Sequence, residues 1–252
     1  MKLRSYITWF DDNDYIGLEL AFPGGSTWKI ERKNKEAENL HTQGEYEIWK
    51  CTPQARATFV CSKVAGNGPP TARIKIHMQI PFFKTATEEP SERAKQADSE
   101  IPHLASSEVK ALTILAESKC SSSPYLIDSM HRQQTDGWVP GGYIHYIAMQ
   151  ILPGVTVCDH YDRMERQERD ELRKAFKKAW IECVSFEVVH GDSASQNLIW
   201  DRERQKCYLI DFENFHPPTS KSRIWRDIQY IGWHLAQIGD DYDYDDMTNW
   251  IL

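Results

Sequence analysis

Short apolar runs separated by turn-forming residues fill the first 80 residues, and this pattern most limits the folds available to the chain. The last run, residues 72–80, alternates cleanly: Ile74, Ile76 and Met78 share one face, as in a strand with one buried side. Gly, Pro, Asp and Asn between the runs favour turns. The pattern predicts an antiparallel sheet, with strands at residues 6–10, 16–22, 27–31, 46–51, 56–64 and 72–80.

Later residues change to helical periodicity. Leu172, Phe176 and Trp180 recur at helical spacing within residues 165–184, which predicts an amphipathic helix. A shorter helix is predicted near residues 106–118, starting at a serine cap, and residues 143–152 are strand-like. Residues 84–103 are polar and without an apolar period, which indicates an exposed loop.

These patterns predict an α+β protein with three regions. Residues 1–45 form a β-rich N-terminal extension, residues 46–152 a sheet with one helix, and residues 153–252 a mainly helical part. A chain of 252 residues can bury a large core, either as one domain or as two lobes that share a cleft.

Composition narrows the class of protein. The formal net charge of −7 disfavours general nucleic-acid binding, although a local basic patch remains compatible with it. No apolar stretch approaches the roughly 20 residues of a membrane helix, and the N-terminus does not resemble a secretory signal. We expect a soluble cytoplasmic protein whose six cysteines, none in a C-x-x-C pair, are reduced and mostly packed.

Polar residues interrupt two strand-like segments, "VVHGDSASQNLIW" (188–200) and "CYLIDFENF" (207–215). Asp192 and Asn197 lie five positions apart in a loop bounded by strands, and Asp211 ends the next strand. One carboxylate to accept a proton and an Asn and Asp to hold a divalent cation are the parts that phosphoryl transfer needs. Each residue alone is also compatible with a turn cap.

The motifs "HGDSASQN" and "DFE" resemble the catalytic and metal-binding loops of the protein-kinase-like superfamily, in its aminoglycoside phosphotransferase and choline kinase branch. The resemblance covers residues 46–236 and implies a bilobal fold. Lys75 would contact nucleotide phosphates and Glu108 would pair with it. Backbone groups from Gln150 to Leu152 would meet the adenine, and Asp227 would brace the catalytic loop.

The chain also departs from that pattern. No glycine-rich loop is present, because Pro53 and Gln54 occupy the expected hairpin tip. Glu213 replaces the glycine of D-F-G, Gly191 replaces an arginine, and only about 40 residues follow "DFE". A protein substrate is therefore not expected.

The function expected from these motifs is ATP- and Mg²⁺-dependent transfer of a phosphoryl group to a hydroxyl of a small molecule, with a cationic acceptor as one option. Asp192 is the expected base, supported by Asp227, and Asn197 and Asp211 are the expected metal ligands. The alternative is a kinase-like scaffold kept for binding or reused for another group transfer. A metal-dependent hydrolase is a third option, and it leaves Lys75 and Glu108 unexplained.

Several other residues have more than one interpretation. His190 is expected to be structural rather than catalytic, and Trp225, Trp233 and Trp250 to be core rather than a cation-binding box. The acidic run 239–247 is either a solvated charge run or a wall of the acceptor site. Lys75 and Glu108, taken singly, also fit a solvated strand face and a first-turn helix charge.

Overall fold

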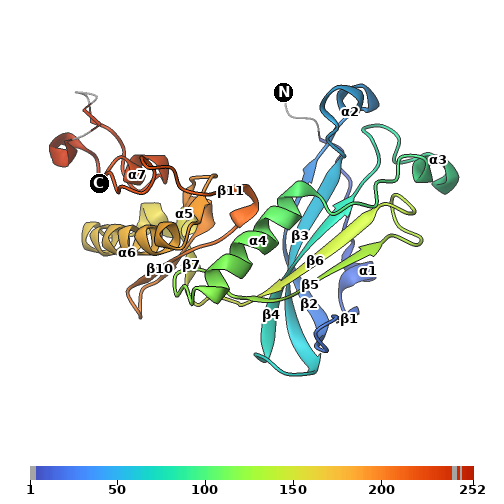
Figure 1. The fold of residues 1–252 in the computed structure, drawn as a ribbon, viewed down its shortest axis with the longest axis horizontal. Helices are drawn as coiled ribbons and strands as arrows, with labels where there is room; N and C mark the ends of the chain where they lie inside the picture. Colours follow the sequence, from blue (N-terminus) through green and yellow to red (C-terminus); the bar gives the residue numbers. More distant parts are fainter. Residues whose placement is uncertain (1–3, 240–242, 245) are drawn as a thin grey trace. The chain divides into compact units, whose positions relative to one another are not determined.

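A computed structural model describes residues 4–239, 243–244 and 246–252 (Figure 1). The chain divides into two compact units, which are described one at a time. Unit 1 contains residues up to 106 together with 126–151, and unit 2 contains residues 107–125 together with 152–252. The boundary at residues 106/107 falls within helix α4 (His103–Glu117).

Unit 1 is built on a six-stranded sheet in the order β1-β2-β3-β4-β6-β5, with every neighbouring pair antiparallel (Figure 1). The α+β class and the antiparallel sheet predicted from the sequence are confirmed. Residues 1–45 supply β1 and β2 of this same sheet. Its strands are β1 (Glu19–Ala21), β2 (Thr27–Asn39), β3 (Gln54–Ala65), β4 (Thr71–Gln79), β5 (Leu126–Gln133) and β6 (Tyr143–Met149).

The core of unit 1 lies on one face of the sheet. Ile74, Ile76 and Met78 of β4 are buried there, as their alternation predicted. Trp9 and Phe10, expected in a strand, instead lie in a non-strand segment before α1 (Asp12–Tyr15) and pack into this core. Burial of their large rings and hydrogen bonds from Trp9 to Glu36 and Glu38, rather than strand pairing, hold the N-terminal segment.

Residues 46–51 were predicted as a strand, and this prediction is wrong, because they belong mostly to helix α2 (Gln43–Trp49). Thr42 and Glu45 form a capping box, in which each side chain accepts from the backbone N–H of the other residue. Ile48 and Trp49 are 72% and 70% exposed, so no buried strand face forms. The T-x-x-E cap was visible in the sequence and competes directly with the strand propensity of the run.

The polar segment 84–103 is anchored to the sheet at several points and contains α3 (Pro90–Ala94). The buried Gln79 donates to the carbonyl of Gln96 at 2.7 Å and accepts from the amide of Asp98 at 2.8 Å. Gln96 in turn accepts from the amide of Phe82 at 2.9 Å. These side-chain hydrogen bonds hold the segment against the sheet, although its sequence has no apolar periodicity.

Helix α4 begins at His103, directly after Pro102, and not at a Ser106 or Ser107 cap. Ser106 lies inside the first turn, where its hydroxyl donates to the carbonyl of His103 at 3.0 Å. The predicted start is therefore about one turn late, because a serine can bond back to the preceding turn as well as cap it.

Unit 2 centres on helix α6 (Arg166–Ser185), which confirms the predicted amphipathic helix. Leu172, Phe176 and Trp180 are buried on one face. Within the described ranges, no helix has both the length and the apolar character that a bilayer span requires. The other elements are β7 (Val155–Thr156), α5 (Val157–His160), η1 (Tyr161–Arg163), β8 (Val189–His190), η2 (Ser195–Asn197), β9 (Leu198–Asp201), β10 (Lys206–Leu209), η3 (Phe212–Asn214), β11 (Phe215–His216), α7 (Gln229–Gly232) and η4 (Met247–Asn249).

A row of basic side chains crosses the sheet of unit 1. Arg56, His77, His145 and His131 lie opposite one another on β3, β4, β6 and β5. Burial, followed by the neighbouring charges, holds the pKa of His77 well below its usual value. Burial, followed by His131, lowers the pKa of His145 to about 4. The folded sheet therefore favours the neutral form of both His77 and His145.

We expect the sheet of unit 1 to lose stability in acid. Between pH 6.5 and about 4 the unfolded chain protonates His145 while the folded chain does not, so the free energy of unfolding falls as pH decreases. The slope contributed by one such group is about 1.4 kcal/mol per pH unit. Urea titrations at several pH values should show a shallower slope for His145→Gln, whereas His103→Gln, at an exposed histidine, should keep the wild-type slope.

Replacing a ring at the centre of unit 1 tests the packing of the N-terminal segment. Phe59 is fully buried, with its centroid 6.1 Å from Phe10 and 5.7 Å from Tyr15. Phe59→Ala should lower the free energy of unfolding by about 3–5 kcal/mol, because a cavity opens between these rings. Val64→Ala, at a half-exposed position of the same strand, is the matched control. Equal losses for the two variants would contradict this packing.

Candidate functional site

The candidate site lies in unit 2, where β8 runs into the loop that carries Asp192. β8 pairs with β11, with His190 opposite Phe215. The amide of Gly191 then donates to the carbonyl of Asn214 at 2.6 Å. A Cβ at Gly191 would lie 2.1 Å from that carbonyl oxygen, so only glycine permits this close approach. The glycine thus fixes where the Asp192 loop leaves the strand.

His190 joins the two polar motifs. Its Nε2–H donates to the carbonyl of Ile210 at 2.8 Å, and its Nδ1 accepts from the amide of Asp192 at 3.2 Å. Its ring packs between Phe212 and Trp233, with both centroids 5.0 Å away. Burial lowers the pKa of His190, which favours the neutral form that these two bonds require. The predicted structural role of His190 agrees with this arrangement.

Asn197 holds the Asp192 loop from the other side. Its side-chain amide donates to the Asp192 carbonyl at 2.9 Å and to Asp192 Oδ2 at 3.2 Å. Its own carbonyl accepts from the amide of Ile210 at 3.0 Å. Asn197 is buried while Asp192 is exposed, so a well-supported amide positions an accessible carboxylate.

Asp211 follows Ile210, which both His190 and Asn197 contact. The backbone of Asp211 is left-handed, with φ 67° and ψ 59°, a conformation that costs a non-glycine residue about 1 kcal/mol. This turn starts η3 and leaves the extended direction of β10 at Asp211. The structure therefore brings Asp192, Asn197 and Asp211 together through the backbone of residue 210.

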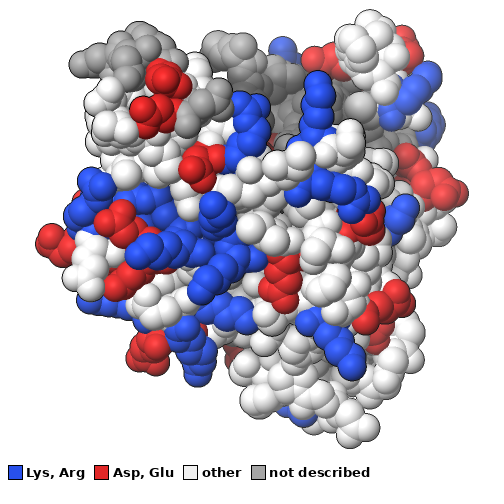
Figure 2. All heavy atoms as spheres, turned by 60° about the vertical axis from the view of Figure 1, so that its left-hand side comes forward, with Lys and Arg blue, Asp and Glu red and all other residues white. Residues whose placement is uncertain are grey.

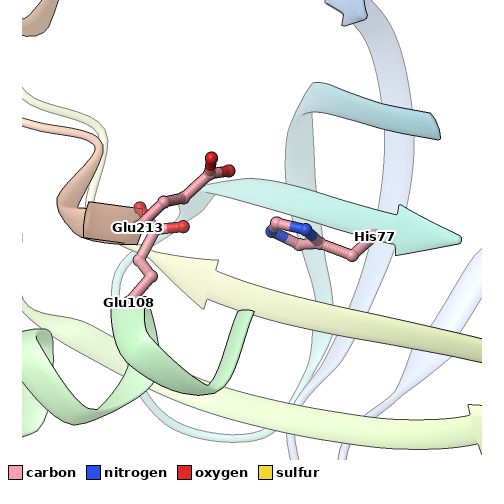
Figure 3. Close-up of side chains that lie close together, drawn as sticks. All are labelled: His77, Glu108 and Glu213. Atoms are coloured by element: carbon pink, nitrogen blue, oxygen red, sulfur yellow. The ribbon is translucent and has the colours of Figure 1, made fainter. Parts of the chain in front are cut away.

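Two buried glutamates form a second feature of unit 2. Glu108 of α4 and Glu213 of η3 are 1% and 4% exposed, and their carboxylate oxygens come within 4.8 Å of each other (Figure 3). No sequence pattern predicts this pair, because the two residues lie far apart along the chain.

The predicted nucleotide residues lie in different units. Lys75 of β4 is 7% exposed and lies opposite Thr58 and Ile147, so the solvated-face interpretation is wrong. Gln150 lies in unit 1, which ends at Ile151, whereas Leu152 and Glu108 belong to unit 2. Pairing of Lys75 with Glu108, and contact of residues 150–152 with adenine, stay predictions.

Asp227 contacts helix α6 through its side chain. Its Oδ1 accepts from Trp225 Nε1 at 2.6 Å and lies 3.6 Å from Lys177 Nζ, which itself lies over the Trp225 ring. Trp225 packs edge-on against Trp180 of the same helix. These contacts place Asp227, whose side chain is 43% exposed, at the edge of the aromatic cluster of unit 2. Its predicted support of the Asp192 loop stays a prediction.

The three tryptophans predicted to be core residues differ in burial. Trp233 and Trp250 are buried, as expected for core residues, and Trp225 is half-buried. The acidic run 239–247 lies partly outside the described residues, so its two interpretations stay open.

Lys and Arg side chains gather in one area of the face in Figure 2, with Asp and Glu among them. A pocket of about 250 Å³ in unit 2 is lined by Lys178, Arg204 and Lys206 together with Glu182.

Gly191→Ala tests the close approach of the two site segments. The new methyl group should push β8 away from Asn214 and lower the free energy of unfolding by about 1–3 kcal/mol, which urea denaturation measures. Gly232→Ala is the matched control, because a Cβ at that position meets no atom within 4 Å. A Gly191→Ala variant as stable as the control would contradict the described contact.

The site thus combines the exposed Asp192 carboxylate after β8, the buried Asn197 amide before β9 and the Asp211 carboxylate after β10. Neither a scan against protein-family models nor a search of curated proteins finds a match to this chain. The superfamily resemblance of the two motifs therefore stays a hypothesis, and the chemistry of these side chains carries the functional proposal.

Proposed function

We propose that this protein is a Mg²⁺- and ATP-dependent phosphotransferase that acts on a hydroxyl of a small molecule. One observation carries the proposal: a single hydrogen-bonded set, centred on the backbone of Ile210, holds Asp192, Asn197 and Asp211 together. Phosphoryl transfer depends on such positioning and on charge neutralisation more than on covalent chemistry.

The donor set suits a hard divalent cation. Asn197 directs its amide nitrogen toward Asp192, so its Oδ1 is the atom that would hold Mg²⁺ together with the Asp211 carboxylate. Amide and carboxylate oxygens are ligands that Mg²⁺ accepts, with phosphate oxygens and water completing its shell. Bound Mg²⁺ would neutralise charge on the transferring phosphoryl group.

Asp192 has the position of a residue that orients and deprotonates an acceptor hydroxyl. Its carboxylate is exposed, and the Asn197 amide at 3.2 Å limits its rotation. The acceptor oxygen would lose its proton to Asp192 as its bond to phosphorus forms and the bond from phosphorus to the donor oxygen breaks. Asp227 would support the loop.

The bilobal protein-kinase-like fold is part of this proposal. Its support is the order of elements: a strand with Lys75, a helix with Glu108, two more strands, and then the unit that contains helix α6, short strands and the two motifs. In this arrangement Lys75 would contact the nucleotide phosphates, and residues Gln150 to Leu152 would meet adenine. The resemblance to small-molecule kinases implies a small-molecule acceptor, and the acidic run 239–247 would favour a cationic one.

One observation favours the alternative of a scaffold without phosphotransfer. The connection between β2 and β3, where a glycine-rich phosphate loop would be expected, contains the capped helix α2. A helix there offers fewer free backbone amides to a phosphate than a glycine loop does. A nucleotide-binding measurement separates the two functions.

We expect ATP with Mg²⁺ to raise the thermal midpoint of the wild-type protein, because a ligand that binds the native state stabilises it. The shift should require both components and should disappear in Asp211→Asn. Asp162→Asn, at an exposed residue of η1 in the same unit, should keep the shift. No shift at millimolar ATP in the wild type would overturn the proposal and support the alternative.

Asp192→Asn should separate binding from transfer. Turnover of ATP with a panel of small hydroxylated amines and sugars should fall by about 100- to 10,000-fold in kcat, the usual contribution of a positioned base. The ATP- and Mg²⁺-dependent thermal shift should persist, because the metal ligands remain. Full turnover in this variant would refute the assignment of Asp192 as the base.

A further inference from the structure

Two cysteines of unit 2 lie close enough to react with each other. Cys120 follows the end of α4, directly after Lys119, whose backbone is left-handed. Cys183 lies in the last turn of α6. Their sulfur atoms are 3.9 Å apart, which is van der Waals contact, although the residues are 63 positions apart in the sequence. The proximity of the two thiols is thus a product of the fold of unit 2.

The two thiols differ in reactivity. A hydrogen bond from Cys183, aided by Ser122 and Ser123, lowers the pKa of Cys120 to about 7, against burial and the charge of Glu182. The same sulfur contact and burial raise the pKa of Cys183 well above its usual value. Cys120 is half-buried, whereas Cys183 is 1% exposed. The reachable thiol is therefore the one that carries thiolate near neutral pH, and the buried thiol stays protonated beside it.

We propose that Cys120 and Cys183 form a redox-sensitive pair that closes to an intramolecular disulfide when a hydroperoxide oxidises Cys120. In the first step the Cys120 thiolate attacks hydrogen peroxide: a sulfur–oxygen bond forms, the oxygen–oxygen bond breaks and hydroxide leaves, giving a sulfenic acid. In the second step the Cys183 sulfur attacks Cys120, the sulfur–oxygen bond breaks, and the hydroxyl leaves with the Cys183 proton as water. The thiols lose two electrons, and the peroxide is reduced to hydroxide and water.

The disulfide would tie together the two segments that lead into the candidate site. The carbonyl of Cys183 accepts from the amide of Val188 at 3.1 Å, immediately before β8. The carbonyl of Ser122 accepts from the amide of Leu209 at 2.9 Å, two residues before Asp211. Glu182 binds the amide of Ser121 at 2.9 Å, which already joins the two cysteine segments. Oxidation would therefore restrain both strands that end at the site, whether or not the protein transfers phosphate.

The first experiment treats the reduced protein with hydrogen peroxide and maps disulfides by mass spectrometry of unreduced peptides. We expect a cross-linked peptide that joins Cys120 to Cys183, loss of two titratable thiols, and full reversal by dithiothreitol. The thermal midpoint of the oxidised protein should rise, because the cross-link restrains a long loop of the unfolded chain. Cys120→Ser should abolish the cross-link, the loss of two thiols and the rise of the thermal midpoint, whereas Cys51→Ser, at an exposed cysteine, should change none of them.

A second measurement keeps the test independent of variant folding. Alkylation of Cys120 by iodoacetamide in the wild-type protein should reach half its maximal rate near pH 7, whereas an ordinary thiol does so near 8.5. Peroxide that leaves Cys120 and Cys183 as thiols, or that oxidises Cys120 without forming the cross-link, would overturn the proposal. Neither outcome bears on ATP binding, so this proposal and the proposed function can fail separately.

Discussion

The hydrogen bond from His190 to the carbonyl of Ile210 is the contact on which the candidate site depends. It joins the end of β8 to the residue before Asp211, and the same imidazole accepts from the amide of Asp192. Both bonds are satisfied only by the neutral ring, which burial between Phe212 and Trp233 favours. The apolar packing of unit 2 therefore sets the protonation state of the residue that aligns its polar groups.

The same principle recurs where other polar side chains are buried. Asn197 is buried and uses its amide to fix the Asp192 loop. Gln79 is fully buried and binds two backbone groups of the segment that follows β4. A buried amide without partners would be destabilising, so each of these residues selects one arrangement of the chain around it. Polar contacts of this kind, rather than apolar periodicity, order the loops of both units.

Local patterns were sufficient where one interaction dominates a segment. The spacing of Leu172, Phe176 and Trp180 predicted α6, and the alternation of Ile74, Ile76 and Met78 predicted β4, because burial of one face outweighs other terms there. The prediction failed at residues 46–51, where the Thr42–Glu45 cap outweighs strand propensity. It also failed at Trp9 and Phe10, which are buried without being in a strand.

The sequence by itself determined the α+β class, the chief helix of unit 2, and the candidate residues Asp192, Asn197 and Asp211, since these follow from periodicity and from motif spacing. Only the tertiary structure decided that residue 210 links those three, that Glu108 lies beside Glu213, and that Cys120 meets Cys183. Such contacts join residues far apart in the chain, and their distances depend on how whole elements pack. A sequence pattern reports which face of an element is buried, but not which side chain of another element lies against it.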